Sequence, residues 1–218
     1  MKNSYYDKKY YLNKHNYLYE NSEYYLARAR VAKEQYFKGI IKKKEKVLEY
    51  GCGFGQNIYL INNATGYDIS GFALDFCKKK GISVVGNLKE LKEESLDAVL
   101  CCEVLEHVEE PLKTLKIINS KLKKEGKLIL VLPIEKDKEP EPLDYNQHLY
   151  SWNFQSITNL LVRAGFYPID YKIVRRTGFK KLLWMNKIGF RFYLFLTKLT
   201  AVMSGSKHMR IISIKRFS

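Results

Sequence analysis

Apolar residues recur along this chain with two different periods. Short apolar runs predict buried strands, and apolar residues at helical spacing between them predict helices. The predicted strands cover residues 46–50 (KVLEY), a short segment ending at Tyr67 and Asp68, 83–85, 98–102, 127–132, 169–175 and 210–215. The predicted helices cover residues 23–38, 56–62, 70–80, 111–123, a segment ending at 164–165, and 180–203. Strands and helices that alternate at this spacing form βαβ units, which favours a parallel sheet with helices on both faces.

Capping residues support several of these boundaries. Ser70 is a favourable N-cap, and Gly81 suits the end of the same helix. Pro111 suits the first turn of the next helix and Gly126 the turn after it. The first 25 residues are rich in Tyr and Lys and show little periodicity, and after Pro133 a polar, proline-broken loop separates the strand-rich part from the C-terminal elements.

Composition limits the classes of protein. With 46% hydrophobic and 28% charged residues, the 218-residue chain is typical of a globular domain. Its formal charge of +15 would suit nucleic acid or a membrane surface. Lys, Asn, Ile and Tyr are enriched together, however, as in proteins encoded by AT-rich genes, so the charge alone does not argue for nucleic acid.

The cysteines and the N-terminus bear on location. None of the four cysteines (Cys52, Cys77, Cys101 and Cys102) forms a C-x-x-C pair, which weakens disulfide and zinc hypotheses. The first 15 residues contain no apolar segment typical of a secretory signal. We therefore expect a reducing, cytoplasmic location, with contact at a membrane surface as an open alternative.

Three glycines alternate directly after the first strand, in "VLEYGCGFGQN" (residues 47–57). Glycine at such a βα turn allows positive φ angles and close approach of a ligand to the backbone. The spacing lacks the third glycine of a dinucleotide-binding G-x-G-x-x-G, and no Lys-Ser/Thr follows as in a phosphate-binding P-loop. Glu49 would repel a pyrophosphate and attract an ammonium group, while Asp68 can accept hydrogen bonds from two ribose hydroxyls. A nucleoside with an amino-acid tail, S-adenosylmethionine, has both groups.

Residues 45–176 resemble the class I S-adenosylmethionine-dependent methyltransferases, in particular the group with the ubiquinone-biosynthesis and small-molecule O-methyltransferases. Five segments carry the resemblance in the expected order: "VLEYGCGFGQN", "GYDIS", "SLDAVLCCEVLEHVEEP", "LKKEGKLILVLP" and "HLYSWNFQSITNLLVRAGF". The resemblance implies a Rossmann-like α/β fold, whose seven-stranded, mostly parallel sheet has an antiparallel last strand. It also implies a division into a Tyr/Lys-rich helical cap (1–45), a cofactor-binding core (46–176), a basic amphipathic helical insertion (177–207) and the last core strand (208–218).

The resemblance also implies the residues that bind S-adenosylmethionine. Around the methionine part and the ribose we expect Glu49, Gly51, Cys52, Gly53 and Asp68; around the adenine Ile69, Asn87 and Leu88; and at the end of the fourth strand Cys102 and Glu103. This chain departs from the family in two places, since Asn87 and Leu88 stand where an acid is usual and Lys124-Glu125 where Pro-Gly is usual.

Methyl transfer to a hydroxyl requires removal of a proton, by a base or with the help of a metal. We expect His107 and His148 to be the catalytic residues. The i, i+3, i+4 spacing places Glu103, Glu106 and His107 on one side of a helical turn. With His148 they resemble the metal site of small-RNA 2′-O-methyltransferases, so a divalent ion, a catalytic base and a structural role all remain open.

The C-terminal segment 180–203 reads as a basic amphipathic helix. Lys180, Lys187, Arg191 and Lys198 fall within about 40° of one another on a wheel of 3.6 residues per turn. Such a helix suits a membrane surface, a lid, or packing on the domain or on a second copy, so the protein would be a monomer or homodimer. We expect an enzyme that methylates oxygen in a small, hydrophobic or lipid-linked acceptor. An RNA methyltransferase, which would need a nucleic-acid partner, and a non-catalytic S-adenosylmethionine-binding protein are the alternatives.

Overall fold

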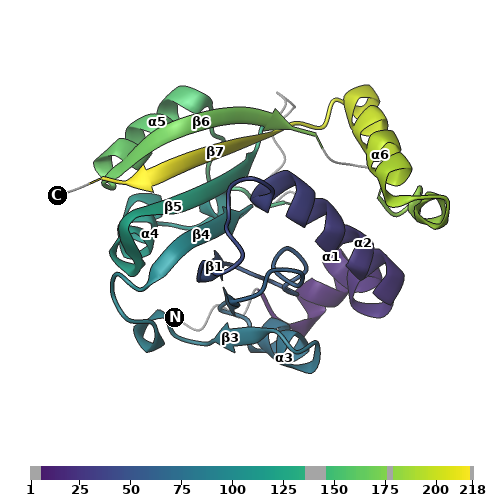
Figure 1. Ribbon diagram of the computed structural model, residues 1–218, viewed down its shortest axis with the longest axis horizontal. Coiled ribbons are helices and arrows are strands. Elements are labelled where there is room, and N and C mark those ends of the chain that lie inside the picture. Colours follow the sequence, from purple (N-terminus) through teal and green to yellow (C-terminus); the bar gives the residue numbers. More distant parts are fainter. Residues whose placement is uncertain (1–5, 136–145, 176–178, 217–218) are drawn as a thin grey trace.

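The computed structural model describes residues 6–135, 146–175 and 179–216, which build a seven-stranded sheet (Figure 1). Its strands are β1 (Val47–Tyr50), β2 (Ala64–Tyr67), β3 (Ser83–Val85), β4 (Leu96–Cys102), β5 (Leu122–Pro133), β6 (Phe166–Val174) and β7 (His208–Lys215). They are ordered β3-β2-β1-β4-β5-β7-β6, and β7 runs antiparallel to both of its neighbours. The predicted Rossmann-like sheet with an antiparallel last strand is confirmed.

Helices cover both faces of the sheet (Figure 1). The α-helices are α1 (Lys8–Glu20), α2 (Ser22–Ala32), α3 (Gly71–Lys79), α4 (Pro111–Lys121), α5 (Phe154–Arg163) and α6 (Phe190–Ser204). A π-helical turn, η1 (Lys33–Phe37), extends α2, and three 3₁₀ turns are η2 (Leu88–Glu90), η3 (Leu105–His107) and η4 (Leu183–Lys187).

Alternation along the central strands explains the two layers. On β4, Val99 and Cys101 face the core that α4 and α5 close, while Ala98 and Leu100 face the core beneath α2 and α3. Successive residues of a strand point to opposite faces, so a strand covered on both sides is apolar throughout. This is why β4 and β5 appear in the sequence as unbroken apolar runs.

Two predicted caps are confirmed. The Ser70 hydroxyl accepts a hydrogen bond from the Ala73 amide at 3.4 Å, at the start of α3. Gly81 follows the end of α3 with a φ of +76°.

Two predicted elements near the sheet are wrong. Residues 56–62 form successive turns instead of a helix, with the Ile58 amide bonded to the Gly55 carbonyl at 3.2 Å. Asparagine side chains form hydrogen bonds that compete with those of a helical backbone, and the side-chain amide of Asn57 donates one to Glu49. The turn expected at Gly126 lies inside β5, because residues 123–126 bulge out between two segments that both pair with β4.

The aperiodic N-terminal segment contains a helix, α1, whose position the hydrophobic pattern did not predict, although a helical cap was expected over residues 1–45. The Asp7 side chain caps it by accepting a hydrogen bond from the Tyr10 amide at 2.9 Å. Its buried residues, Tyr11 and Leu18, pack in an aromatic cluster with Phe54 and Phe76. Tyrosine is neither plainly apolar nor polar, so its use on both faces hides the helical period.

The C-terminal segment is also different from its prediction. The single helix expected at 180–203 is broken at Gly189 into η4 and α6. Tyr193, Thr197 and Ala201 form the buried side of α6, and the Tyr193 hydroxyl donates to the Phe179 carbonyl at 3.1 Å. In Figure 1, α6 lies at the edge of the molecule, at the opposite side from α4 and α5.

Candidate active site

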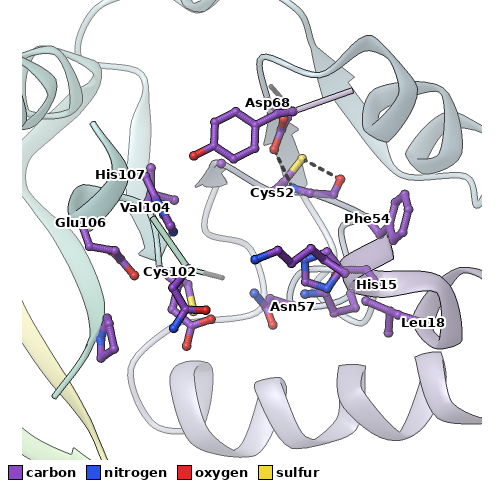
Figure 2. A pocket seen from close by; sticks show the side chains of 18 of the residues that line it. His15, Leu18, Cys52, Phe54, Asn57, Asp68, Cys102, Val104, Glu106 and His107 are labelled. Atoms are coloured by element: carbon purple, nitrogen blue, oxygen red, sulfur yellow. Dashed lines mark hydrogen bonds between the residues drawn. The ribbon is translucent and has the colours of Figure 1, made fainter. Parts of the chain in front are cut away.

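A cleft of about 1880 Å³ opens at the carboxyl ends of β1, β2 and β4, with α1 and part of α6 along its rim. Side chains from the glycine loop, the end of β2, the segment after β4 and helix α1 converge on it (Figure 2). Two groups of residues face each other across it. The loop wall comprises residues 51–57 and Asp68. The histidine wall comprises five residues that line the cleft and Glu135, which pairs with His148 behind the lining: His107, His148, His208, Glu103, Glu106 and Glu135.

The glycines of the loop wall are required by the geometry. Gly51 has a φ of +74°, and a Cβ there would lie 2.4 Å from Cγ2 of Val104. A Cβ on Gly55, with φ +70°, would lie 2.6 Å from Cδ1 of Ile82. Both positions therefore combine a left-handed backbone with a close neighbouring side chain of the protein itself, so the loop packs closely against its surroundings. Gly51 and Gly53 line the cleft, and Gly55 is not among the lining residues.

Glu49 lies beneath the loop and is buried. Its Oε1 accepts a hydrogen bond of 2.6 Å from the Asn57 amide, and Asn57 lines the cleft while Glu49 does not. The expected contact of Glu49 with a ligand stays a prediction. Asn57 is the residue through which the charge of Glu49 would reach the cleft, and nothing in the sequence pattern had marked it as a site residue.

Asp68 is the buried acid at the end of β2, and it lines the cleft. Its carboxylate accepts hydrogen bonds from the Gly53 amide at 2.8 Å and the Ser70 amide at 2.9 Å. The Tyr11 hydroxyl lies 3.4 Å from both carboxylate oxygens. Burial raises the pKa of Asp68, and the hydrogen bonds oppose that rise. The carboxylate is thus oriented by the backbone and covered by α1.

The remaining predicted cofactor residues divide into two groups. Ile69, Cys102 and Glu103 line the cleft, together with Gly51, Cys52 and Gly53. Asn87 and Leu88 are not among the lining residues: the Asn87 side chain caps η2, and Leu88 packs against the core. The structure therefore does not bring Asn87 and Leu88 together with the other residues expected to contact the cofactor.

The histidine wall brings both predicted catalytic residues together. The rings of His107 and His148 meet edge to face, with 4.7 Å between centroids. Nδ1 of His148 lies 2.6 Å from Oε1 of Glu135. Burial, with His148 beside it, lowers the pKa of His107 to about 4, so its imidazole is neutral near pH 7. One ligand atom each from Glu106, His107 and His148 can lie within 4.8 Å of the others, as a metal ion requires.

Glu103 does not join this group, which corrects the predicted helical arrangement. Its backbone is left-handed, with φ +56°, so it does not share a helical side with Glu106 and His107. Its Oε1 pairs instead with Nε2 of His208 at 2.8 Å. His208 is the first residue of β7 and of the last core strand expected at 208–218, but nothing in the sequence pattern marked it as a site residue.

Helix α1 contributes two further groups that the sequence analysis missed. Tyr11 covers Asp68, and His15 lines the cleft across from His107 (Figure 2). Burial, with Arg28 adding to it, lowers the pKa of His15 to about 4. All four histidines of the chain thus line one cleft. The N-cap Asp7 was the one available signal for this helix.

The model of a family described as "Methyltransferase domain" matches residues 19–171. An uncharacterised protein of Methanocaldococcus jannaschii is 42% identical over 100 residues, which are 44% of this chain and 44% of that protein. The chain thus matches less than half of the length of that relative.

Two solved structures have a similar fold. A protein of Thermotoga maritima, described as an S-adenosylmethionine-dependent methyltransferase and possible histamine N-methyltransferase, superposes with a TM-score of 0.63 at 19% identity. The superposition covers 94% of this chain and 97% of that one. The [4+2]-cyclase SpnF superposes with a TM-score of 0.60 at 18% identity, over 87% of this chain and 81% of that one. At these identities the likeness establishes the fold alone.

Proposed function

Because this chain belongs to the methyltransferase-domain family, within the class I S-adenosylmethionine-dependent methyltransferases, we propose that it methylates an oxygen of a small, partly apolar acceptor. The observation that carries the proposal is the opposition of the two walls. A backbone loop with a buried acid lies on one side of the cleft, and a His–carboxylate pair with a neutral histidine lies on the other. The narrower ubiquinone-biosynthesis group stays a prediction.

The loop wall suits S-adenosylmethionine. Gly51 and Gly53 line the cleft, where a ligand could contact their backbone, and Asp68 offers two carboxylate oxygens toward ribose hydroxyls. Asn57 and Glu49 would orient the methionine ammonium, and Ile69, which is 56% exposed, offers an apolar surface to the adenine. When bound, the cofactor supplies an electrophilic methyl group. The protein residues orient it and the acceptor, and positioning alone can account for a large part of the acceleration.

The histidine wall suits removal of the acceptor's proton. His148 uses Nδ1 toward Glu135, which leaves Nε2 to accept a proton from a hydroxyl. The Glu135 carboxylate would stabilise the resulting imidazolium, as in other His–carboxylate pairs. His107 would remain neutral and orient the acceptor, because a group of such low pKa is a weak base. A divalent ion held by Glu106, His107 and His148 is a second way to activate the same hydroxyl.

The acceptor would be a small molecule with an apolar part. Aromatic and aliphatic side chains such as Tyr10, Val108 and Ile117 line the cleft beside the histidine wall. No described segment presents a recognisable RNA-binding module. An RNA acceptor, and a protein that binds the cofactor without turnover, are the competing outcomes of the test below.

Methyl transfer itself is the test, since one fold supports many reactions and a protein of similar fold is a cyclase. Calorimetry first measures binding of S-adenosylmethionine and S-adenosylhomocysteine. Release of S-adenosylhomocysteine is then followed with small-molecule extracts and with RNA as acceptors, with and without a chelator. We expect turnover with the small-molecule pool. Binding without turnover would support the non-catalytic alternative, and no binding would contradict the assignment of the loop wall.

A further inference from the structure

The charge of this chain is unevenly distributed. Residues 171–218 contain no Asp or Glu, whereas the first 170 residues hold all 23 acidic and 26 of the 38 basic residues. The basic residues of the C-terminal segment are Lys172, Arg175, Arg176, Lys180, Lys181, Lys187, Arg191, Lys198, Lys207, Arg210, Lys215 and Arg216. The net charge of +15 therefore comes mostly from the part of the chain that contains α6.

Large apolar side chains of the same segment face solvent. Ile188, Phe192, Phe195, Leu199 and Val202 are each between 44% and 66% exposed, and their spacing alternates between four and three residues. In a helix this spacing keeps the last four of them on one side of α6, opposite the buried Tyr193 and Thr197, while Ile188 lies before Gly189, the N-cap of the helix. We call these five residues the α6 ridge.

Two neighbouring residues extend the α6 ridge at its ends. Trp184, in η4, is 58% exposed, and Met203, at the end of α6, is 80% exposed. Met203 also lines the cleft, together with Thr200. The ridge thus leads from the edge of the molecule to the mouth of the candidate active site.

Basic residues flank the ridge on the same helix. Arg191 and Lys198 are exposed and lie on the solvent side of α6, next to Phe195, and Lys187 is exposed in η4. Helices with Trp and Phe on an apolar side and Lys or Arg beside it lie in membrane interfaces and prefer anionic lipids. Among the described residues no helix is long and apolar enough to cross a bilayer, so the ridge would lie on the surface.

We propose that the α6 ridge and its basic flank dock the protein onto an anionic lipid surface, with the mouth of the cleft next to the membrane. A second copy of the chain is a poorer occupant, because a two-fold contact would bring Arg191 and Lys198 toward their own counterparts. The apolar acceptor could then reach the cleft from the lipid. That last step rests on the proposed function, whereas docking does not.

Vesicle flotation with the full chain tests the proposal. Binding is compared for neutral phosphatidylcholine vesicles and for vesicles with added phosphatidylglycerol, at low and high salt. We expect binding to the anionic vesicles only, and about a tenfold loss when salt rises from roughly 0.05 to 0.5 M. Phe195→Glu with Val202→Glu, and separately Arg191→Gln with Lys198→Gln, should each lower binding about tenfold or more.

Val202→Glu alone and Val162→Glu are the matched pair, because both valines are about half exposed and each replacement adds one negative charge, on the ridge for Val202 and away from it on α5 for Val162. A Trp152→Phe variant leaves Trp184 as the one tryptophan, and its emission should shift to the blue on anionic vesicles. Thermal unfolding of each variant shows that it is folded.

Three outcomes would overturn the proposal. One is anionic binding that the ridge variant leaves unchanged. The second is dimerisation that Phe195→Glu abolishes, without vesicle binding, which would assign the face to a second copy. The third is binding of poly-glutamate but not of vesicles, which would assign it to an acidic protein. None depends on methyl transfer, and calorimetry of S-adenosylmethionine tests the loop wall separately.

Discussion

The two walls of the cleft are held in different ways. The loop wall is made of backbone in left-handed conformation and a buried carboxylate that receives backbone hydrogen bonds. The histidine wall is made of side chains from four separated segments, joined by His–carboxylate pairs. The first depends on a few neighbouring residues, the second on the assembled fold. We expect the loop wall to determine cofactor affinity and the histidine wall to determine turnover.

The largest effect should follow from His148→Gln. If His148 removes the acceptor's proton, kcat should fall about 10²- to 10⁴-fold. Cofactor affinity, measured by calorimetry, should change little. His208→Gln is the comparison variant, since His208 lies in the same wall but pairs with Glu103. Equal losses in both variants, or loss of cofactor binding in the first, would contradict the separation of the walls.

The divalent ion can be tested with the same two variants. Binding of Mn²⁺ or Zn²⁺ to the wild type should be lost in His148→Gln and kept in His208→Gln, because only His148 belongs to the cluster with Glu106 and His107. Turnover that is indifferent to a chelator would leave His148 as the base without a metal.

Gly51→Ala should break the loop wall. The left-handed conformation costs about 1–2 kcal/mol for a non-glycine residue, and the contact with Val104 adds about 1–3 kcal/mol of overpacking. Gly81→Ala separates the two causes, since Gly81 also has a positive φ but nothing within 4 Å of a Cβ. Urea unfolding should show a larger loss for Gly51→Ala, and Val104→Ala should recover part of it. Equal losses at both glycines would mean that Val104 does not constrain the loop.

Asp68→Asn should weaken the cofactor without affecting the histidine wall. A hydrogen bond to a charged group contributes about 1.5–3 kcal/mol, which is roughly a 10- to 100-fold loss of affinity. Calorimetry with S-adenosylhomocysteine measures this, and Asp75→Asn, an exposed acid on α3, is the control. Unchanged affinity in Asp68→Asn would remove Asp68 from the site.

The same contrast explains what the sequence could predict. Gly51, Gly53 and Asp68 were predictable because backbone geometry and a strand end restrict residue type locally. The unbroken apolar runs of β4 and β5 likewise follow from burial on both faces. The Glu103–His208 pair was not predictable from the sequence. It joins the end of β4 to β7 across more than a hundred residues, so it depends on the order of the strands in the sheet. Helix α1 was missed because tyrosines occupy both its buried and its exposed faces.

Low pH should destabilise the protein through the histidines of the cleft. His15 and His107 have pKa values of about 4, below the usual 6.5, so the unfolded chain binds more protons than the folded one between these values. The free energy of unfolding should therefore fall as the pH drops from about 6.5 to 4. The raised pKa of Asp68 has the opposite effect on the free energy of unfolding, because just above pH 3.8 its carboxylate binds more protons in the folded chain than in the unfolded one. Urea unfolding between pH 4 and 7 should show a shallower slope in His15→Gln; an unchanged slope would mean that the fold does not lower the pKa of His15.

The smallest effect, and the finest test of the loop wall, concerns Tyr11. Its hydroxyl lies 3.4 Å from both oxygens of Asp68, a long contact on the carboxylate that the ribose hydroxyls would use. If the cofactor displaces that contact, Tyr11→Phe should bind S-adenosylhomocysteine as tightly as the wild type or up to about threefold more tightly, because a weak hydrogen bond no longer competes. The ring of Tyr11 packs 4.9 Å from that of Phe54, so Tyr11→Ala should instead loosen α1 and weaken binding. A loss of affinity in Tyr11→Phe equal to that in Tyr11→Ala would mean that the hydroxyl itself helps to bind the cofactor, and the loop wall would then include α1.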